Sequence, residues 1–306
     1  PLVIQPEVMA YNPSLLDQAN APYPYEGWTT VDFENTLRAL KIDPEDPAPY
    51  VSLDVAGSYI FGLIASYGGL PLDFRTHPVT VDFTSPENAA AIRQVLDLAK
   101  DGYIGYDKLS ELSFSGLAVD IEDSDIPLFS ILVNEFFFDV GSSDTFAMVE
   151  FPQGTTYTSL IYDLGNAYIS ANTPHAEACY RFISKVSDHP ELFTGMPARQ
   201  SQLSNPQLET SQGTSATTFY QRLGALMSQP NAVLFPTGLS NNIETFQDFL
   251  MYSWLFRAFD RYVLEDADLE QELEEAEVYT IGFQQCVAAL DPFDASDNLF
   301  SYFRQY

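Results

Sequence analysis

Strand-like and helix-like segments alternate along this chain, and this alternation constrains its fold more than any other feature. Residues 1–11 form an apolar, extended stretch, which Asn12-Pro13 interrupts because the residue before a proline avoids the helical region. Ser85-Pro86 and Thr173-Pro174 each combine a helix-capping residue with a proline in the first helical position, a pattern typical of helix starts. Strands that alternate with helices indicate an α/β architecture.

Two helices are predicted in more detail. Thr29 or Thr30 is expected to cap one helix, and Trp28 before the cap is expected to pack onto it as a hydrophobic staple. Near the carboxyl end, apolar or small residues recur in steps of four and three, which predicts an amphipathic helix whose glutamates form a solvated acidic face. The apolar stripe is Leu269, Leu273, Ala276, Thr280, Phe283, Val287 and Leu290, and the glutamates are Glu270, Glu272, Glu274, Glu275 and Glu277.

The charge of the chain limits its partners. Its 43 acidic residues exceed its 13 basic residues, which gives a net charge of -30. Such a surface repels phosphate backbones and anionic lipid headgroups, so it disfavours nucleic acid and membrane surfaces and favours a neutral or cationic small ligand. The longest uncharged stretch, residues 55–72, contains four glycines and a proline, and it is predicted to be a buried helix followed by a turn.

Enzyme motifs are mostly absent from the sequence. It has no HExxH, GxGxxG, GKS/T or GxSxG motif, and its three histidines do not suit a His-rich zinc site, so no metal site and no cofactor is expected. One enzymatic alternative is a glycoside hydrolase, because Asn134-Glu135 follows a strand-like run and many retaining glycosidases present their acid/base carboxylate in this way. That reaction needs a second carboxylate, and Asp139 is too close in sequence to supply it from another strand.

Aromatic side chains are abundant, with 23 Phe, 18 Tyr and 2 Trp. Flat rings beside a few amide and carboxylate groups suit a neutral polyhydroxy ligand, because its C–H faces stack on the rings while its hydroxyls need hydrogen-bond partners. For each ring taken alone, core packing is the favoured explanation. The rings considered for ligand contact are Tyr59, Phe61, Phe136, Phe137, Phe138, Phe246, Tyr252 and Trp254.

A resemblance to a known family rests on eight segments taken together. They are Pro6 to Asn12, Gly27 to Thr29 with the following helix, Leu63 to Gly69, Val81 to Glu87, Phe151-Pro152, Gly165 to Ser170, Ala176 to Ala178 with its helix, and Pro190 to Phe193. Their joint order and spacing resemble the extracellular solute-binding proteins of bacterial ABC importers, in the carbohydrate group that includes maltose-binding protein.

The resemblance implies a two-lobed, periplasmic-binding-protein-like (type II) α/β fold that holds ligand between its lobes and releases it by hinge bending. Residues 5–159 and 231–306 are then expected to form the second lobe, and residues 1–4 and 160–230 part of the first. Gln5 and Leu160 are expected at the hinge. Because members of the family extend further in the amino-terminal direction, the resemblance implies a fragment that lacks most of the first lobe.

The same resemblance implies a binding site in the second lobe. The stacking rings are expected to be Tyr59, Phe137 and Trp254, and the hydroxyl partners Asp54, Asn134, Glu135 and Asp139. The implied function is the non-catalytic capture of a sugar or oligosaccharide and its delivery to the permease subunits of an ABC importer. The resemblance also implies an extracellular or periplasmic location, with a lipid anchor on a missing amino-terminal segment, and a monomer is expected. A cationic ligand such as a polyamine is an alternative, and it predicts an affinity that falls steeply with salt.

Overall fold

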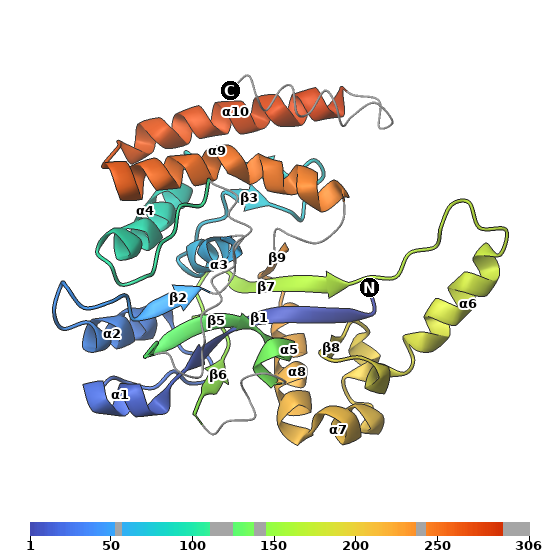
Figure 1. Cartoon of the computed structure of the whole chain (residues 1–306). Helices are drawn as coiled ribbons and strands as arrows, with labels where there is room; N and C mark the ends of the chain where they lie inside the picture. Colours follow the sequence, from blue (N-terminus) through green and yellow to red (C-terminus); the bar gives the residue numbers. More distant parts are fainter. Residues whose placement is uncertain (53–56, 111–124, 138–144, 237–242, 290–306) are drawn as a thin grey trace.

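A central mixed sheet organises the chain (Figure 1). The structure is a computed structural model that describes residues 1–52, 57–110, 125–137, 145–236 and 243–289. The sheet has seven strands in the order β2-β5-β1-β7-β9, and β6 and β8 also pair with β1. The strands are β1 (Val3–Tyr11), β2 (Tyr50–Ser52), β5 (Leu128–Leu132), β6 (Ala147–Val149), β7 (Thr158–Gly165), β8 (Met196–Pro197) and β9 (Ala232–Pro236).

Helices cover both faces of this sheet (Figure 1). One face carries α3 (Ser58–Ser66), α4 (Pro86–Lys100), α9 (Ile243–Glu265) and α10 (Leu269–Ala288), together with the small antiparallel pair β3 (Leu72–Asp73) and β4 (Thr80–Val81). The other face carries α5 (Val133–Glu135), α7 (Pro206–Gln212) and α8 (Thr214–Met227). Two apolar clusters fill these layers, one beneath α3, α4, α9 and α10, and the other between the sheet and α8.

The remaining helices lie at the periphery. They are α1 (Pro13–Ala19), α2 (Thr30–Leu40), α6 (Ala176–Val186) and two short 3-10 turns at Pro190–Leu192 and Gln200–Gln202. α6 extends away from the sheet and buries no residue, and Tyr180 and Phe182 on it are mostly exposed. No helix in the described part of the chain is long and apolar enough to cross a membrane.

Several helix predictions are confirmed. Thr29 is the N-cap of α2 and forms a capping box with Asp32. Trp28 is fully buried and meets the ring of Phe33 edge-on at 5.7 Å, which is the expected staple. The uncharged stretch forms α3, whose residues are all buried, and the chain turns after Tyr67.

Two details of the helices differ from the sequence predictions. α6 begins at Ala176 rather than after Thr173, because the Thr173 hydroxyl accepts the His175 backbone N–H at 3.2 Å and forms a local turn instead of a helix cap. The apolar stripe of α10 is buried as expected from Leu269 to Phe283, Val287 is partly buried and Leu290 lies outside the described residues, but Glu272 is not solvated. It is 6% exposed and pairs with Arg261 at 2.7 Å, so α9 supplies the counter-charge that burial demands.

Residues that the sequence analysis assigned to different lobes pack together in one apolar cluster. Phe219 and Tyr220 of α8 share an apolar cluster with Val8 of β1 and Phe129 of β5. In this structure, α8 therefore packs on the same sheet as the segments assigned to the second lobe. The division into lobes remains a prediction.

Candidate functional site at the carboxyl edge of the sheet

Four strands of the sheet run in the same direction and end at one edge. β2 is parallel to β5 and β7 is parallel to β9, while β1 is antiparallel to both β5 and β7. The arrowheads of β2, β5 and β7 point toward the end where β1 begins (Figure 1). In open α/β sheets, ligands bind outside the carboxyl ends of the strands. We therefore place the candidate site here and call it the carboxyl edge, formed by residues 3–5, 133–137 and the start of α3.

The carboxyl edge has an interruption beside β1. β8 pairs with Val3 and Ile4, and β5 pairs with residues 7–11. β7 pairs with residues 3–6, on the opposite side of β1 from β8. Among the described residues, Gln5 and Pro6 therefore have a strand partner on one side only, and α5, which follows β5 directly, contacts β1.

Two buried amide oxygens near this interruption have no hydrogen-bond donor within the described residues. They are Gln5 Oε1 and Asn134 Oδ1. The other end of the Gln5 amide is satisfied, because its Nε2 donates to the backbone oxygen of Thr194 at 3.1 Å. A buried acceptor without a donor costs about 1–3 kcal/mol, and a ligand that donates a hydrogen bond removes that cost. The two oxygens therefore suit a ligand rich in hydroxyl or amino groups.

Two carboxylates add to the acceptors at this edge. Glu135 is exposed on α5, and Glu7 on β1 is 5% exposed. Glu7 pairs with Leu132, only three residues before Glu135. The chemistry of the carboxyl edge is thus that of hydrogen-bond acceptors.

Phe137 is the expected stacking ring that belongs to the carboxyl edge, three residues after Asn134. It is half-buried, and it meets Phe136 edge-on at 5.7 Å and Tyr220 of α8 edge-on at 6.0 Å. The Tyr220 hydroxyl donates to Gln212 Oε1 at 2.8 Å, and burial raises the pKa of Tyr220, so this hydroxyl stays protonated as a donor. The packing fixes one side of Phe137 and leaves part of the ring accessible.

Tyr59 and Trp254 are not presented at the carboxyl edge. Tyr59 is the second residue of α3, at the start of the helix, but its side chain is buried, with 3% of the residue exposed. Its hydroxyl donates to the backbone oxygen of Gly105 at 3.3 Å. Trp254 on α9 is 5% exposed and packs against Tyr279 and Phe283 of α10, with ring centroids 6.4 and 5.4 Å away. Both rings therefore serve the core in this structure, and their burial does not support a stacking role.

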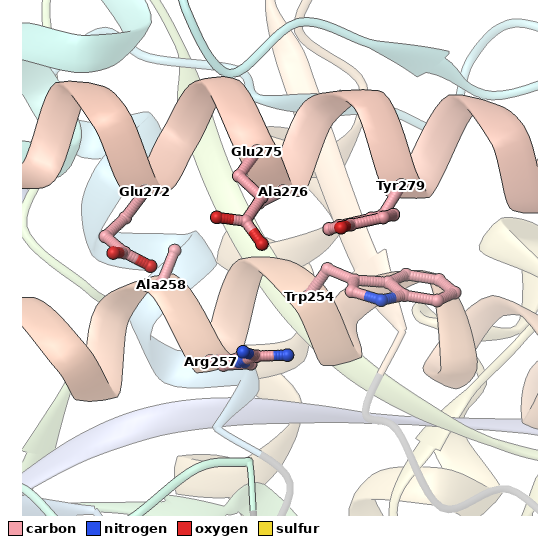
Figure 2. Close-up of a pocket in the computed structure, with 7 residues that line it drawn as sticks. All are labelled: Trp254, Arg257, Ala258, Glu272, Glu275, Ala276 and Tyr279. Carbon is pink, nitrogen blue, oxygen red and sulfur yellow. The ribbon is translucent and has the colours of Figure 1, made fainter. Parts of the chain in front are cut away.

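The surroundings of Trp254 form a small hollow between α9 and α10 (Figure 2). The indole lies beneath the ring of Tyr279, and the exposed residues Arg257 and Glu275 also line the hollow. The volume of this hollow is about 210 Å³ and includes open solvent. The hollow belongs to the helix pair and takes no residue from the carboxyl edge.

Two expected site residues, Asp54 and Asp139, lie outside the described residues. The two expected hinge residues are on neighbouring strands, since Gln5 pairs with Asp163 of β7 and Leu160 of β7 pairs with Leu234 of β9. The chain thus passes the proposed hinge three times side by side. Bending at this place remains a prediction.

Sequence reasoning did not assign Gln5 or Glu7 to the site. Both are polar residues in the apolar, extended stretch of residues 1–11, and both are partly or fully shielded from solvent in β1. Polar side chains inside a strand that is otherwise apolar are a signal that was available in the sequence.

No family model and no curated protein matches the chain. Solved structures do match, and their similarity shows the fold. An ABC substrate-binding protein from Listeria monocytogenes, in complex with cycloalternan, is 17% identical with a TM-score of 0.63, over 92% of this chain and 70% of that chain. The GacH receptor of Streptomyces glaucescens, solved unliganded and with acarbose, is 14% identical with a TM-score of 0.63, over 91% of this chain and 69% of that chain.

A third structure, MalE3 of T. maritima with bound maltose, is 16% identical with a TM-score of 0.61, over 92% of this chain and 71% of that chain. These matches extend over nearly all of the chain. The chain has the α/β fold of type II periplasmic binding proteins, as the resemblance implied.

Proposed function

We propose that the protein is the substrate-binding component of an ABC importer and captures a neutral sugar or oligosaccharide at the carboxyl edge. The observation that carries this proposal is the buried Oδ1 of Asn134, which has no hydrogen-bond donor among the described residues, three residues before the partly accessible ring of Phe137 on the same helical turn. A sugar supplies hydroxyl donors to the first and a C–H face to the second. The fold supports the proposal, since structures that share it are described with cycloalternan, acarbose and maltose.

In this proposal the ligand shifts a population of conformations. The sugar contacts the second lobe at Asn134, Glu135 and Phe137 and a first lobe on its other side, and both sets of contacts form only when the lobes close. Binding therefore favours the closed form by the difference in affinity between the two arrangements. Gln5 and Leu160 are the proposed hinge positions, on adjacent strands where a small backbone rotation changes the angle between the lobes.

The proposal extends to partners and location. The closed, sugar-loaded protein is delivered to the membrane permease subunits outside the cytoplasmic membrane, in an extracellular or periplasmic compartment, and a lipid anchor retains it at the cell envelope. It acts as a monomer without a cofactor or a nucleic-acid partner. The net charge of -30 supports the absence of a nucleic-acid partner, because such a surface repels phosphate backbones.

The experiment is titration calorimetry of the protein against a panel of neutral mono- and oligosaccharides, with Asn134→Ala and Asn172→Ala as variants. Asn172 is an exposed amide between β7 and α6, outside the residues that form the carboxyl edge, and serves as the matched control. We expect the Asn134 variant to bind its sugar about tenfold more weakly and the Asn172 variant to bind as the unaltered protein does. Absence of heat with every sugar contradicts the proposal.

A cationic ligand is the second candidate, and the net charge of -30 favours it because an acidic surface attracts cations. The same calorimeter distinguishes it, because polyamine binding weakens steeply between low and high salt whereas binding of a neutral sugar does not. Steady release of reducing sugar that is abolished in Glu135→Gln would instead identify a glycosidase.

A further inference from the structure

A buried carboxylate on α9 holds the loop that borders the start of α3. Asp260 is 3% exposed and lies in a stretch of α9 that is otherwise rich in buried aromatic residues. Its Oδ1 accepts the Tyr106 hydroxyl at 2.9 Å and the Leu109 backbone N–H at 2.9 Å. Its Oδ2 accepts the Ser110 backbone N–H at 2.7 Å. One carboxylate thus fixes a side chain and two backbone amides of residues 106–110, which we call the clamped loop.

The clamped loop is tied to the sheet and to α3 at its other end. The Gly105 backbone N–H donates to the Tyr50 backbone oxygen of β2 at 2.7 Å, and the Tyr59 hydroxyl of α3 donates to the Gly105 oxygen at 3.3 Å. The side chain of Leu109 lies against Gly57, the N-cap of α3, so closely that a Cβ at Gly57 would approach it within 2.9 Å. Asp260 therefore determines how closely the clamped loop packs on the start of α3.

Packing of the core alone does not require a buried carboxylate at position 260. A leucine would fill the same space in α9 without the cost of burying a charge, whereas a carboxylate makes charge-assisted hydrogen bonds that fix the direction of each donor. Burial, and then the charge of Asp260, raises the pKa of Tyr106, which keeps the Tyr106 hydroxyl protonated as a donor. The benefit is a fixed position for a loop that lies beside the end of β2 and the N terminus of α3.

We propose that Asp260 is a positioning residue for the binding site. It does not touch the ligand. It acts through the clamped loop, which holds the start of α3 in the place where the carboxyl edge can receive a sugar. The inference rests on the proposed function and adds to it a residue of α9 that lies outside the carboxyl edge.

The test combines hydrogen exchange with sugar titration on Asp260→Asn. An asparagine has one acceptor oxygen, and its amino group faces the amides that the carboxylate accepts, so at least one bond of the clamped loop is lost. We expect the amides of Leu109 and Ser110 to exchange about tenfold faster, the amide of Gly105 to stay protected, and sugar affinity to fall about fivefold or more.

The matched control is Glu272→Gln, which neutralises another buried carboxylate on the same helix pair; that carboxylate bonds to Arg261 rather than to the clamped loop. We expect this variant to keep its sugar affinity. If Asp260→Asn does not fold, Tyr106→Phe removes one donor and leaves the carboxylate in place, and we expect it to weaken sugar binding in the same direction.

Unchanged affinity despite faster exchange in Asp260→Asn overturns the inference, and so does an equal loss of affinity in Glu272→Gln. In both cases the unaltered protein still binds sugar, and the proposed function stands. Absence of sugar binding in the unaltered protein overturns the proposed function and this inference with it.

Discussion

Arg222→Met tests how strongly a buried ion pair joins α8 to the rest of the fold. Glu150, at the end of β6, has a side chain only 4% exposed. Its Oε1 accepts the Gly27 backbone N–H at 2.7 Å, and its Oε2 accepts the Arg222 guanidinium of α8. Arg222 also lies 3.4 Å from Glu26 and stacks over Phe219 at 4.7 Å.

The expected loss follows from what Arg222→Met leaves behind. Methionine keeps the packing over Phe219 but removes the counter-charge, so a buried carboxylate remains without its cation. Breaking a fully buried pair in this way costs about 3–5 kcal/mol. The Arg222 side chain is 25% exposed, and water can reach the vacated position, so we expect the free energy of unfolding to fall by about 2–3 kcal/mol.

The assay is urea unfolding of the variant beside two others. Arg38→Met removes an exposed pair with Glu34, spaced four residues apart on α2, and we expect a change below about 0.5 kcal/mol. Arg222→Met combined with Glu150→Gln should be more stable than Arg222→Met alone, because the second change removes the stranded charge. A loss below about 0.5 kcal/mol in Arg222→Met would refute the reasoning.

Three further predictions concern stability. Gly154→Ala places a Cβ 2.1 Å from the Ser66 backbone oxygen, so we expect chemical unfolding to show that the free energy of unfolding falls by about 2 kcal/mol or more. The control is Gly27→Ala, where the positive φ is strained for alanine but no atom lies within 4 Å of the new Cβ, and we expect a loss of about 1 kcal/mol. Hydrogen bonds from Thr29, the N-cap of α2, hold the pKa of Asp32 below its usual range. The stability that ionised Asp32 contributes is therefore present above its unfolded-state pKa and is lost as the pH falls through its lower folded-state pKa. Asp32→Asn should flatten the dependence of the free energy of unfolding on pH below about pH 4. Phe182→Ser on α6 should leave the free energy of unfolding unchanged to within about 0.5 kcal/mol, since this ring is 69% exposed, and a larger loss would mean that the face is covered.

Several helices could be predicted from the sequence because their caps and apolar stripes depend on contacts between residues that are close in the chain. The Trp28 staple, the capped start of α2 and the stripe of α10 each depend on residues a few positions apart. Glu272 was misjudged for the complementary reason. Its burial depends on Arg261, which approaches from another helix, and no pattern within α10 reveals that partner.

The site was partly predictable. Asn134, Glu135 and Phe137 follow a strand, and the structure places this strand among those that end at the carboxyl edge. The resemblance implied stacking roles for Tyr59 and Trp254, but an aromatic ring suits a core as well as a sugar. Sequence periodicity does not separate the two roles, and the structure shows both rings buried, so their contact with a ligand remains a prediction.

The most direct test of the central claim is to map the amide chemical shifts of the protein as a sugar from the calorimetric panel is added. The account predicts that the largest changes fall on residues 134–137 and around Gln5, at the carboxyl edge. It also predicts that amides lining the hollow between α9 and α10, such as those of Arg257 and Glu275, change little. Changes centred on that hollow, or spread evenly over the chain, would contradict the account.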